Sequence, residues 1–504
     1  MSGSGFSTQL SHAKGIGNAI WAAVIIITAL RLAFIWQMGL MPQDAYYHLY
    51  GEYPALSYFD HPSAIAWVLQ AATSIFGKKV FAIKLADTVV TLGTLLVFYR
   101  LSLHVLSRAG SRNALLLLYS TLMVTILSLV STPDTPLLLF WALSLLCLYR
   151  AIFLERKWYW LWTGIAMGLA FNSKYTALFL PFGMMLYLVL SRPHRPLLLS
   201  PWPWLSLCGF GVVSLPVVIW NVQHGFASFR FQSSARVSSG LQLNPLDVLG
   251  VIGHQAAILM PVLLFALVYF IYRMVRKYRW HIGRLPSPQL FLLCFFLPVF
   301  LGFFIISPVY WVKLNWMMPA YVSGIIWVAV WFREKYLRWQ WICSLVVHLA
   351  LAVEIIWYPV PVNSDDVWVG WDGLAVQAGT LERQYPGDFI FSADDYKTSA
   401  VLTFYLDSLV YSRNVLGMPA LQFDYIREDV QALAGRNAIF INSVPDNTGF
   451  KDEQAFTEVL RRYFSTVSSL PPIVIRKGDR VLRTFLVYRC TDYRPPVKQK
   501  IPFQ

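Results

Sequence analysis

The chain has 504 residues, of which 57% are hydrophobic and 13% are charged, and its mean hydropathy is +0.53. This composition excludes an ordinary soluble protein and indicates a polytopic membrane protein. The net charge of +15 could suggest a nucleic-acid partner, but Lys and Arg lie mostly in short loops between apolar segments, where they set membrane orientation. We therefore expect membrane lipid, and no nucleic acid, as a partner.

Apolar windows of about 20 residues predict eleven membrane-spanning helices. The first apolar run is long and has no small-residue cleavage site, so we expect it to remain as a helix rather than to be removed as a signal peptide. The expected helices are 18–40, 79–99, 113–131, 136–153, 158–172, 176–191, 201–220, 246–272, 288–306, 315–332 and 340–358.

The loops between these helices form two sets that differ in positive charge. One set is rich in Lys and Arg, with a dense block at Arg273–Arg284, and the opposite set is poor in both. The positive-inside rule makes the rich set cytoplasmic. The loop 41–78 and the C-terminus then face outward, to the periplasm if the chain lies in the inner (plasma) membrane of a Gram-negative bacterium.

Acidic residues become much more frequent after about Pro359. This change predicts a boundary between a membrane domain, residues 1–358, and a soluble domain, residues 359–504. Short apolar runs such as 388–391 alternate there with helix-like runs such as 453–464, which is typical of a small α/β domain. The predicted fold class is an all-α polytopic membrane bundle of about eleven transmembrane helices with a small C-terminal α/β extracytoplasmic domain.

A polar stretch of the membrane part, PQDAYYHLYGEYPALSYFDHP, runs from Pro42 to Pro62. It directly follows the first apolar segment and places acids and histidines among aromatic side chains. A carboxylate at a membrane surface is costly to desolvate and indicates a functional site. Aromatic rings pack on apolar sugar faces while acids accept hydrogen bonds from hydroxyl groups, so this stretch favours a sugar-binding site with Asp44 as the first catalytic candidate.

Other polar stretches are expected at the same outer surface, and they bring together acids and bases that are far apart in the sequence. These stretches are STPDTP (131–136), NSKYT (172–176), WNVQHGFASFRFQ (220–232) and SPVYWVKLNW (307–316). The candidate catalytic acids are Asp44, Asp60 and Asp134; the candidate cations are Lys174, Arg230, Arg236 and Lys313; Tyr46, Tyr47 and His61 are further candidates for substrate binding.

Each candidate also has a purely structural interpretation. Asp60 and Asp134 precede apolar runs and could cap helices, with Pro136 in the first turn of the second. Lys174 could extend to the lipid headgroups, and the tyrosines could form an interfacial aromatic belt. The sequence leaves these alternatives open.

Four stretches in order, PQDAYYHLYGEYPALSYFDHP, STPDTPLLLFWAL, GLAFNSKYTALFLP and WNVQHGFASFRFQ, resemble bacterial members of the GT-C membrane glycosyltransferases. The resemblance is to the protein O-mannosyltransferase-like family (glycosyltransferase family 39), which is related to the lipid A aminoarabinose transferase, and it spans roughly residues 18–320. It implies a polyprenyl-phosphate-sugar donor, an active site in the first outer loop and inversion at the anomeric carbon. It also implies a helical bundle with a soluble outer domain.

The first outer loop departs from the pattern of that family at one position. The family carries an Asp–Glu pair there, and the matching residues are Gln43 and Asp44. The family's catalytic aspartate is the first of the pair, so a strict match falls on Gln43, which cannot act as a base. We therefore expect Asp44 to take this role through a small shift.

Together these features predict an inverting hexosyl or pentosyl glycosyltransferase that moves a sugar from a polyprenyl phosphate to lipid A or lipopolysaccharide, another envelope glycan, or a protein. A carboxylate would remove the proton of an acceptor hydroxyl as it attacks the sugar, and a cation would stabilise the departing lipid phosphate. A phosphate acceptor would need no strong base. No cofactor is required, although clustered carboxylates leave a divalent metal open.

Two other functions stay open. A transporter or flippase of lipid-linked sugars usually shows inverted repeats and polar helices at the membrane midplane, and the sequence shows no repeat. A non-catalytic protein that only binds polyprenyl lipids is favoured by Gln43 in place of an acid. Activity of the purified protein on a lipid-linked sugar separates the three.

Overall fold

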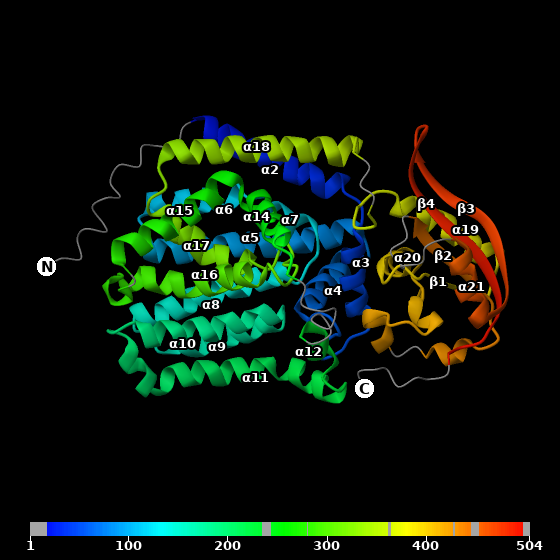
Figure 1. The fold of residues 1–504 in the computed structure, drawn as a ribbon, viewed down its shortest axis with the longest axis horizontal. Helices are drawn as coiled ribbons and strands as arrows, with labels where there is room; N and C mark the ends of the chain where they lie inside the picture. Colours follow the sequence, from blue (N-terminus) through cyan, green and yellow to red (C-terminus); the bar gives the residue numbers. More distant parts are fainter. Residues whose placement is uncertain are drawn as a thin grey trace.

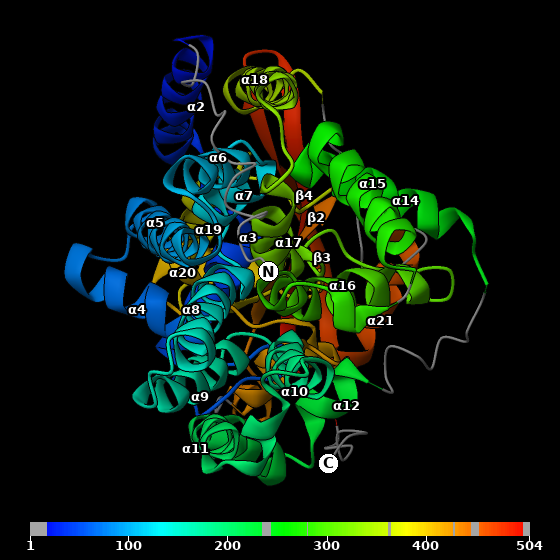
Figure 2. The same ribbon diagram turned by 90° about the vertical axis from the view of Figure 1, so that its left-hand side faces the viewer.

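Long helices run side by side along the longest axis of the molecule, and a smaller lobe of mixed helices and strands lies at one end (Figure 1). The structure is a computed structural model that describes residues 18–233, 243–279, 281–360, 364–426, 429–444 and 453–496. Turned by 90°, the long helices are seen end-on and form a bundle rather than a single layer (Figure 2). We call residues 364–496 the C-terminal lobe.

The helices before the C-terminal lobe differ in length and place. Three short ones lie at the end of the bundle next to the lobe (Figure 1): α3 (Pro42–Glu52), α4 (Ala64–Phe76) and α12 (Ala227–Gln232). The helices of the bundle itself are α2 (Asn18–Gln37), α5 (Val80–Val105), α6 (Arg108–Tyr119), α7 (Leu122–Leu129), α8 (Asp134–Phe153), α9 (Trp158–Phe171), α10 (Phe179–Leu190), α11 (Pro201–Gln223), α14 (Leu246–Leu259), α15 (Pro261–Tyr278), α16 (Ser287–Ile306), α17 (Met318–Ala329) and α18 (Glu334–Trp357).

Six of the described helices, namely α2, α5, α8, α11, α16 and α18, are long and apolar enough to cross a membrane. The number rises to eight if the bent pairs α6–α7 and α14–α15 each count as one span. The chain is therefore a multi-pass membrane protein, but the expected count of eleven spans is not confirmed. The remaining expected spans appear as the helices α9, α10 and α17, which have only 14, 12 and 12 residues.

Two of the expected spans are broken, and in one of them the sequence interrupts the backbone ladder. The pair α14–α15 bends by 114° at Met260, whose φ of 68° lies outside the helical region, and Pro261 then begins the next helix. Proline donates no backbone hydrogen bond and disfavours a helical residue before it. The pair α6–α7 bends by 61° between Tyr119 and Leu122.

Two glycines of α9 allow α9 and α11 to pack closely just before the loop that follows α9. A Cβ atom on Gly164 would meet the backbone oxygen of Ser206 on α11 at 2.2 Å, and one on Gly168 would meet Val213 Cβ at 2.5 Å. Glycines one helical turn apart let two membrane helices approach closely. The contact fixes the end of α9, from which the NSKYT stretch emerges.

The C-terminal lobe has a four-stranded sheet in the order β1-β2-β4-β3. Strand β1 is parallel to β2, and the other neighbours are antiparallel. The apolar runs expected as strands form β1 and β2, and the mixed structure agrees with the predicted α/β character. Its strands are β1 (Phe389–Phe391), β2 (Ala438–Val444), β3 (Phe464–Lys477) and β4 (Arg480–Tyr493), and its helices are α19 (Trp371–Gln384), α20 (Lys397–Leu406) and α21 (Glu453–Tyr463).

Helix α3 joins the bundle to the C-terminal lobe, and both contribute to one buried apolar cluster. The ring of Tyr46 lies 4.3 Å from that of Tyr396, measured between centroids. The backbone N–H of Gln422 donates to the Tyr46 hydroxyl at 3.1 Å, and its side-chain oxygen accepts from the backbone N–H of Phe59 at 2.8 Å. The first half of the stretch that the sequence predicted as an outer loop, Pro42–Glu52, is therefore a helix between the bundle and the C-terminal lobe.

Candidate functional site

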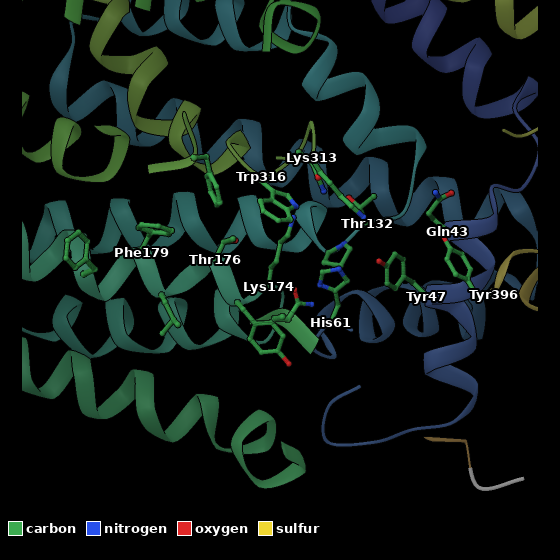
Figure 3. A pocket seen from close by; sticks show the side chains of 17 residues that line it. Gln43, Tyr47, His61, Thr132, Lys174, Thr176, Phe179, Lys313, Trp316 and Tyr396 are labelled. Carbon is green, nitrogen blue, oxygen red and sulfur yellow. The ribbon is translucent and has the colours of Figure 1, made fainter. Parts of the chain in front are cut away.

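A pocket of about 700 Å³ lies between the end of the bundle and the C-terminal lobe. It gathers residues from five of the polar stretches singled out in the sequence and from the start of α20. Figure 3 shows their side chains around it. The lining residues are Gln43, Tyr47, His61, Thr132, Pro133, Lys174, Tyr175, Thr176, Leu178, Phe179, Phe182, Gln232, Phe303, Lys313, Asn315, Trp316 and Tyr396.

The two ends of this pocket differ in chemistry. Gln43, Tyr47 and Tyr396 stand together at the end nearest the lobe, while Phe179 lies at the other end, farther along the bundle (Figure 3). Lys174, Lys313 and Trp316 are between them. The apolar end also includes Leu178 and Phe182, each 53% exposed, so it opens at the side of the bundle. The pocket can hold a ligand with a polar head, an anionic centre and an apolar tail.

The middle of the pocket is organised by the ion pair of Lys174 with Asp134. The Lys174 ammonium donates to both carboxylate oxygens of Asp134 at 2.9 Å, and Asn315 donates to the same carboxylate. Asp134 is 1% exposed and Lys174 is 5% exposed. An ammonium has three N–H groups, so this ion pair orients Lys174 and leaves one donor for a ligand.

The local sequence explains why these two side chains meet. Asp134 is in the first turn of α8, where a carboxylate interacts favourably with the helix dipole. Helix α9 ends at Phe171, and Lys174 has extended backbone angles before the next short helix. Thr176 lies beside it in the pocket lining, and its buried hydroxyl has no hydrogen-bond partner within the described ranges.

Asp44 does not line the pocket. It is 0% exposed and pairs with Lys84 of α5. Its oxygens also accept from the backbone N–H groups of Met41 and Ser131, both at 2.8 Å. These contacts connect the start of α3 to α5 and to the loop before α8. Both oxygens of the carboxylate that the sequence favours as a base therefore already accept hydrogen bonds from the protein.

Gln43, in contrast, lines the pocket. The side chains of consecutive residues in an α-helix point about 100° apart, so Gln43 faces the pocket while Asp44 faces the bundle. The structure thus places Gln43 at the pocket and Asp44 beside Lys84, while the catalytic role expected of Asp44 stays a prediction. Gln43 Nε2 donates to Asp366 Oδ1 at 2.9 Å, and its Oε1 is buried with no hydrogen-bond partner in the described part of the chain.

Asp60 and Tyr46 do not line the pocket but contact each other next to lining residues. Asp60 is 9% exposed and accepts hydrogen bonds from the hydroxyls of Tyr46 and Tyr50. Burial, and then the nearby Asp60 charge, raise the pKa of Tyr46 well above its usual value, so this hydroxyl remains a donor. The next residue, His61, does line the pocket, together with Tyr47.

The remaining candidate cations have different positions. Lys313 is exposed and lines the pocket. Arg230 is exposed on α12 but is absent from the lining, to which its neighbour Gln232 contributes. Arg236 lies outside the described residues. Over the described ranges, no group of three or more His, Cys, Asp or Glu side chains is placed to hold a metal ion.

Several lining residues were not singled out from the sequence. Asn315 and Trp316 belong to a stretch that was recognised only for Lys313, although their polar and aromatic side chains resemble those of the first outer loop. Tyr396 comes from the C-terminal lobe, and no sequence signal relates it to a membrane loop. The lobe therefore contributes to the pocket in a way that only the structure reveals.

Comparisons with known proteins agree with this fold. The family model of dolichyl-phosphate-mannose-protein mannosyltransferases matches residues 60–220. The lipid A galacturonosyltransferase RgtD of Rhizobium johnstonii is 28% identical over 64% of this chain and 65% of its own length. The putative mannosyltransferase YycA of Bacillus subtilis is 29% identical over 26% of this chain and 20% of its own. The chain thus matches less than two thirds of either relative's length.

Among solved structures, ArnT from Cupriavidus metallidurans bound to undecaprenyl phosphate matches with a TM-score of 0.63 and 14% identity, over 94% of this chain and 98% of ArnT. Its apo state matches with a TM-score of 0.59 and 13% identity over the same shares. The match extends through the bundle and the C-terminal lobe. The chain therefore has the GT-C fold of ArnT, and its sequence is similar to that of RgtD.

Proposed function

We propose that this protein is an inverting glycosyltransferase that moves a hexosyl or pentosyl group from a polyprenyl-phosphate donor to an acceptor at the periplasmic face of the bacterial inner membrane. The observation that carries this proposal is the pocket with Lys174 at its centre, a polar end beside the C-terminal lobe and an apolar end open at the side of the bundle. The C-terminal lobe then lies on the periplasmic side.

The donor fits the pocket in one direction. Its phosphate binds between Lys174, Lys313 and the Thr176 hydroxyl, because an ammonium and a hydroxyl both donate to phosphate oxygens. Its polyprenyl chain leaves past Leu178, Phe182 and neighbouring apolar side chains into the bilayer, where exposed apolar groups cost nothing. Its sugar then extends toward the polar end.

The chemistry needs a cation more than it needs an acid. As the acceptor oxygen bonds to the anomeric carbon, the bond from that carbon to the phosphate oxygen breaks and negative charge increases on the lipid phosphate. Lys174 is fixed by Asp134 before the donor arrives, so it stabilises this charge without reorganising. We propose that Asp134 is a positioning residue for Lys174.

The acceptor is proposed from chemistry and from relatives. ArnT was solved with undecaprenyl phosphate bound, which supports a polyprenyl phosphate as a ligand of this chain. RgtD acts on lipid A, which supports lipid A or another envelope glycan as the acceptor, ahead of a protein. Gln43, Tyr47 and His61 offer hydrogen-bonding groups for either the sugar or the acceptor.

The experiment is a transfer assay on the purified full chain in lipid nanodiscs. A panel of polyprenyl-phosphate sugars is mixed with lipid A, and mass spectrometry follows free polyprenyl phosphate and the mass of lipid A. We expect both products to increase in equal amounts with at least one donor. Binding of donors without any product would instead identify a non-catalytic binder, and movement of intact donor across a sealed vesicle would identify a flippase.

A further inference from the structure

A carboxylate of the C-terminal lobe lies beside the polar end of the pocket, where a lining residue contacts it. Gln43 lines the pocket, and its Nε2 donates to Asp366 Oδ1 at 2.9 Å. Asp366 is 323 residues away in the sequence, in the segment between α18 and α19. The amide at the pocket wall therefore contacts a residue that was not singled out in the sequence analysis.

Asp366 differs from the other carboxylates near the pocket in its exposure. Asp44, Asp60 and Asp134 are each at most 9% exposed and each accept two or more hydrogen bonds from protein groups. The Asp366 side chain is 48% exposed, and its second described contact is a long one, 3.5 Å from Lys397 Nζ. It is thus the carboxylate among these four that is accessible to solvent, and it lies next to an amide that lines the pocket.

The segment that carries Asp366 is firmly held. The adjacent Asp365 is 0% exposed, pairs with Arg483 of β4 and accepts from the Ser443 hydroxyl at 2.5 Å. Such buried, hydrogen-bonded charges hold a segment in one arrangement. The contacts of Asp365 therefore fix the backbone next to Asp366 in its position beside α3.

The closeness of Asp366 to the pocket also affects the pKa of a lining residue, Tyr396. Burial, and next the charge of Asp366, raise the pKa of the Tyr396 phenol well above its usual value. Tyr396 lines the pocket beside Gln43 and precedes Lys397 in the chain. The charged and titratable groups that face Asp366 are thus Lys397 and Tyr396, with Gln43 as its hydrogen-bond donor.

We propose that Asp366 is the catalytic base of the transfer reaction, supplied by the C-terminal lobe in place of an acid on α3. This role rests on the proposed glycosyltransferase function. The acceptor hydroxyl forms its bond to the anomeric carbon and gives its proton to the Asp366 carboxylate. The bond from the anomeric carbon to phosphate breaks, and its electron pair leaves with the lipid phosphate beside Lys174.

Gln43 has a defined part in this arrangement. Its amide N–H orients the Asp366 carboxylate, and its buried Oε1 can accept a hydrogen bond from a bound hydroxyl. A glutamate in its place has the same length, so its carboxylate would lie within hydrogen-bond distance of Asp366, and two carboxylates at that distance repel each other. A glutamine on α3 is thus what a carboxylate from the lobe requires.

The test compares Asp366→Asn with the wild type in the transfer assay. We expect kcat to fall by about 10²–10⁴-fold, the contribution of a general base, and the acidic limb of the pH–rate profile to disappear. The matched control is Asp372→Asn, which removes an exposed carboxylate six positions later in the same part of the lobe. Its kcat and pH profile should be those of the wild type.

A double variant separates chemistry from structure. Gln43→Glu/Asp366→Asn keeps a hydrogen bond between the two positions with its direction reversed, and it places a carboxylate at the polar end. We expect it to recover at least about tenfold of the lost rate with the titrating limb restored, because a base at this place is again within reach. Thermal unfolding of each variant shows whether the lobe remains attached to α3.

Two results would overturn the proposal. If Asp366→Asn turns over at the wild-type rate with an unchanged pH profile, the transferase function stands and Asp366 has no part in it. If the double variant is folded and as inactive as Asp366→Asn, the residue only joins the lobe to α3. An inactive wild type, measured first in the same assay, would contradict the transferase function itself and this role with it.

Discussion

Replacement of Lys174 by glutamine should lower kcat/KM for sugar transfer by about 10²–10³-fold, the effect of removing one fixed donor from a developing negative charge. Lys174 is the buried cation of the pocket, and Asp134 and Asn315 hold it in place before any ligand binds. Glutamine retains a hydrogen-bond donor but has no charge. Steady-state kinetics with a lipid-linked sugar measure the effect.

The single substitution also leaves the Asp134 charge buried without its partner, which typically costs about 3–5 kcal/mol of stability. The double variant Lys174→Gln/Asp134→Asn removes both charges and keeps neutral hydrogen-bonding groups. We expect its melting temperature to return close to the wild-type value while transfer remains as low as in the single variant. A stable double variant that transfers sugar at the wild-type rate would show that Lys174 serves folding rather than catalysis.

Replacement of Asp44 by asparagine should reduce the free energy of unfolding by about 3–5 kcal/mol, because it leaves the Lys84 charge buried without a counter-charge. Both side chains are 0% exposed, and Asp44 also receives two backbone N–H groups that position α3. The expected result is a low yield of folded protein. The folded fraction should keep a kcat within a few fold of the wild type.

The matched control replaces both partners, as Asp44→Asn/Lys84→Met, so that no unpaired charge remains. We expect the double variant to be more stable than Asp44→Asn, as is usual when a buried ion pair is replaced as a unit. The opposite outcome is a well-folded Asp44→Asn protein whose kcat falls by about 10²–10⁴-fold. That outcome would make Asp44 the base that the sequence favours and would remove this role from Asp366.

Hydrophobic periodicity predicts most of the bundle, because a long apolar helix needs only its own residues to satisfy its backbone in a membrane. It does not predict every break in an apolar run: Pro261 accounts for the bend at Met260, whereas no proline marks the bend between α6 and α7. The same applies to residues 42–52, which look like a loop by composition and form α3 between the bundle and the lobe.

The site could be predicted in part. The polar stretches identify Tyr47, His61, Lys174 and Lys313 as pocket residues, since these stretches meet at one end of the bundle. The pattern could not show which of Gln43 and Asp44 faces the pocket, because this depends on the rotation of α3 about its own axis. The roles assigned to Asp44, Asp60 and Asp134 stay predictions.

The contribution of the C-terminal lobe was beyond sequence reasoning. Tyr396 and Asp366 approach α3 only because the lobe packs on it, and nothing in their local sequence relates them to a residue more than 300 positions earlier. Contacts of such separation follow from the three-dimensional arrangement of the two bodies. A complete pocket therefore requires both.

A structure of the protein with bound polyprenyl phosphate, determined by electron cryo-microscopy in nanodiscs, tests the central claim most directly. We predict the phosphate within hydrogen-bond distance of Lys174 Nζ and the first prenyl units against Phe179 and Phe303. A phosphate bound elsewhere, for example at the basic block Arg273–Arg284, with the pocket closed to lipid, would contradict the assignment of the pocket as the donor site and the mechanism derived from it.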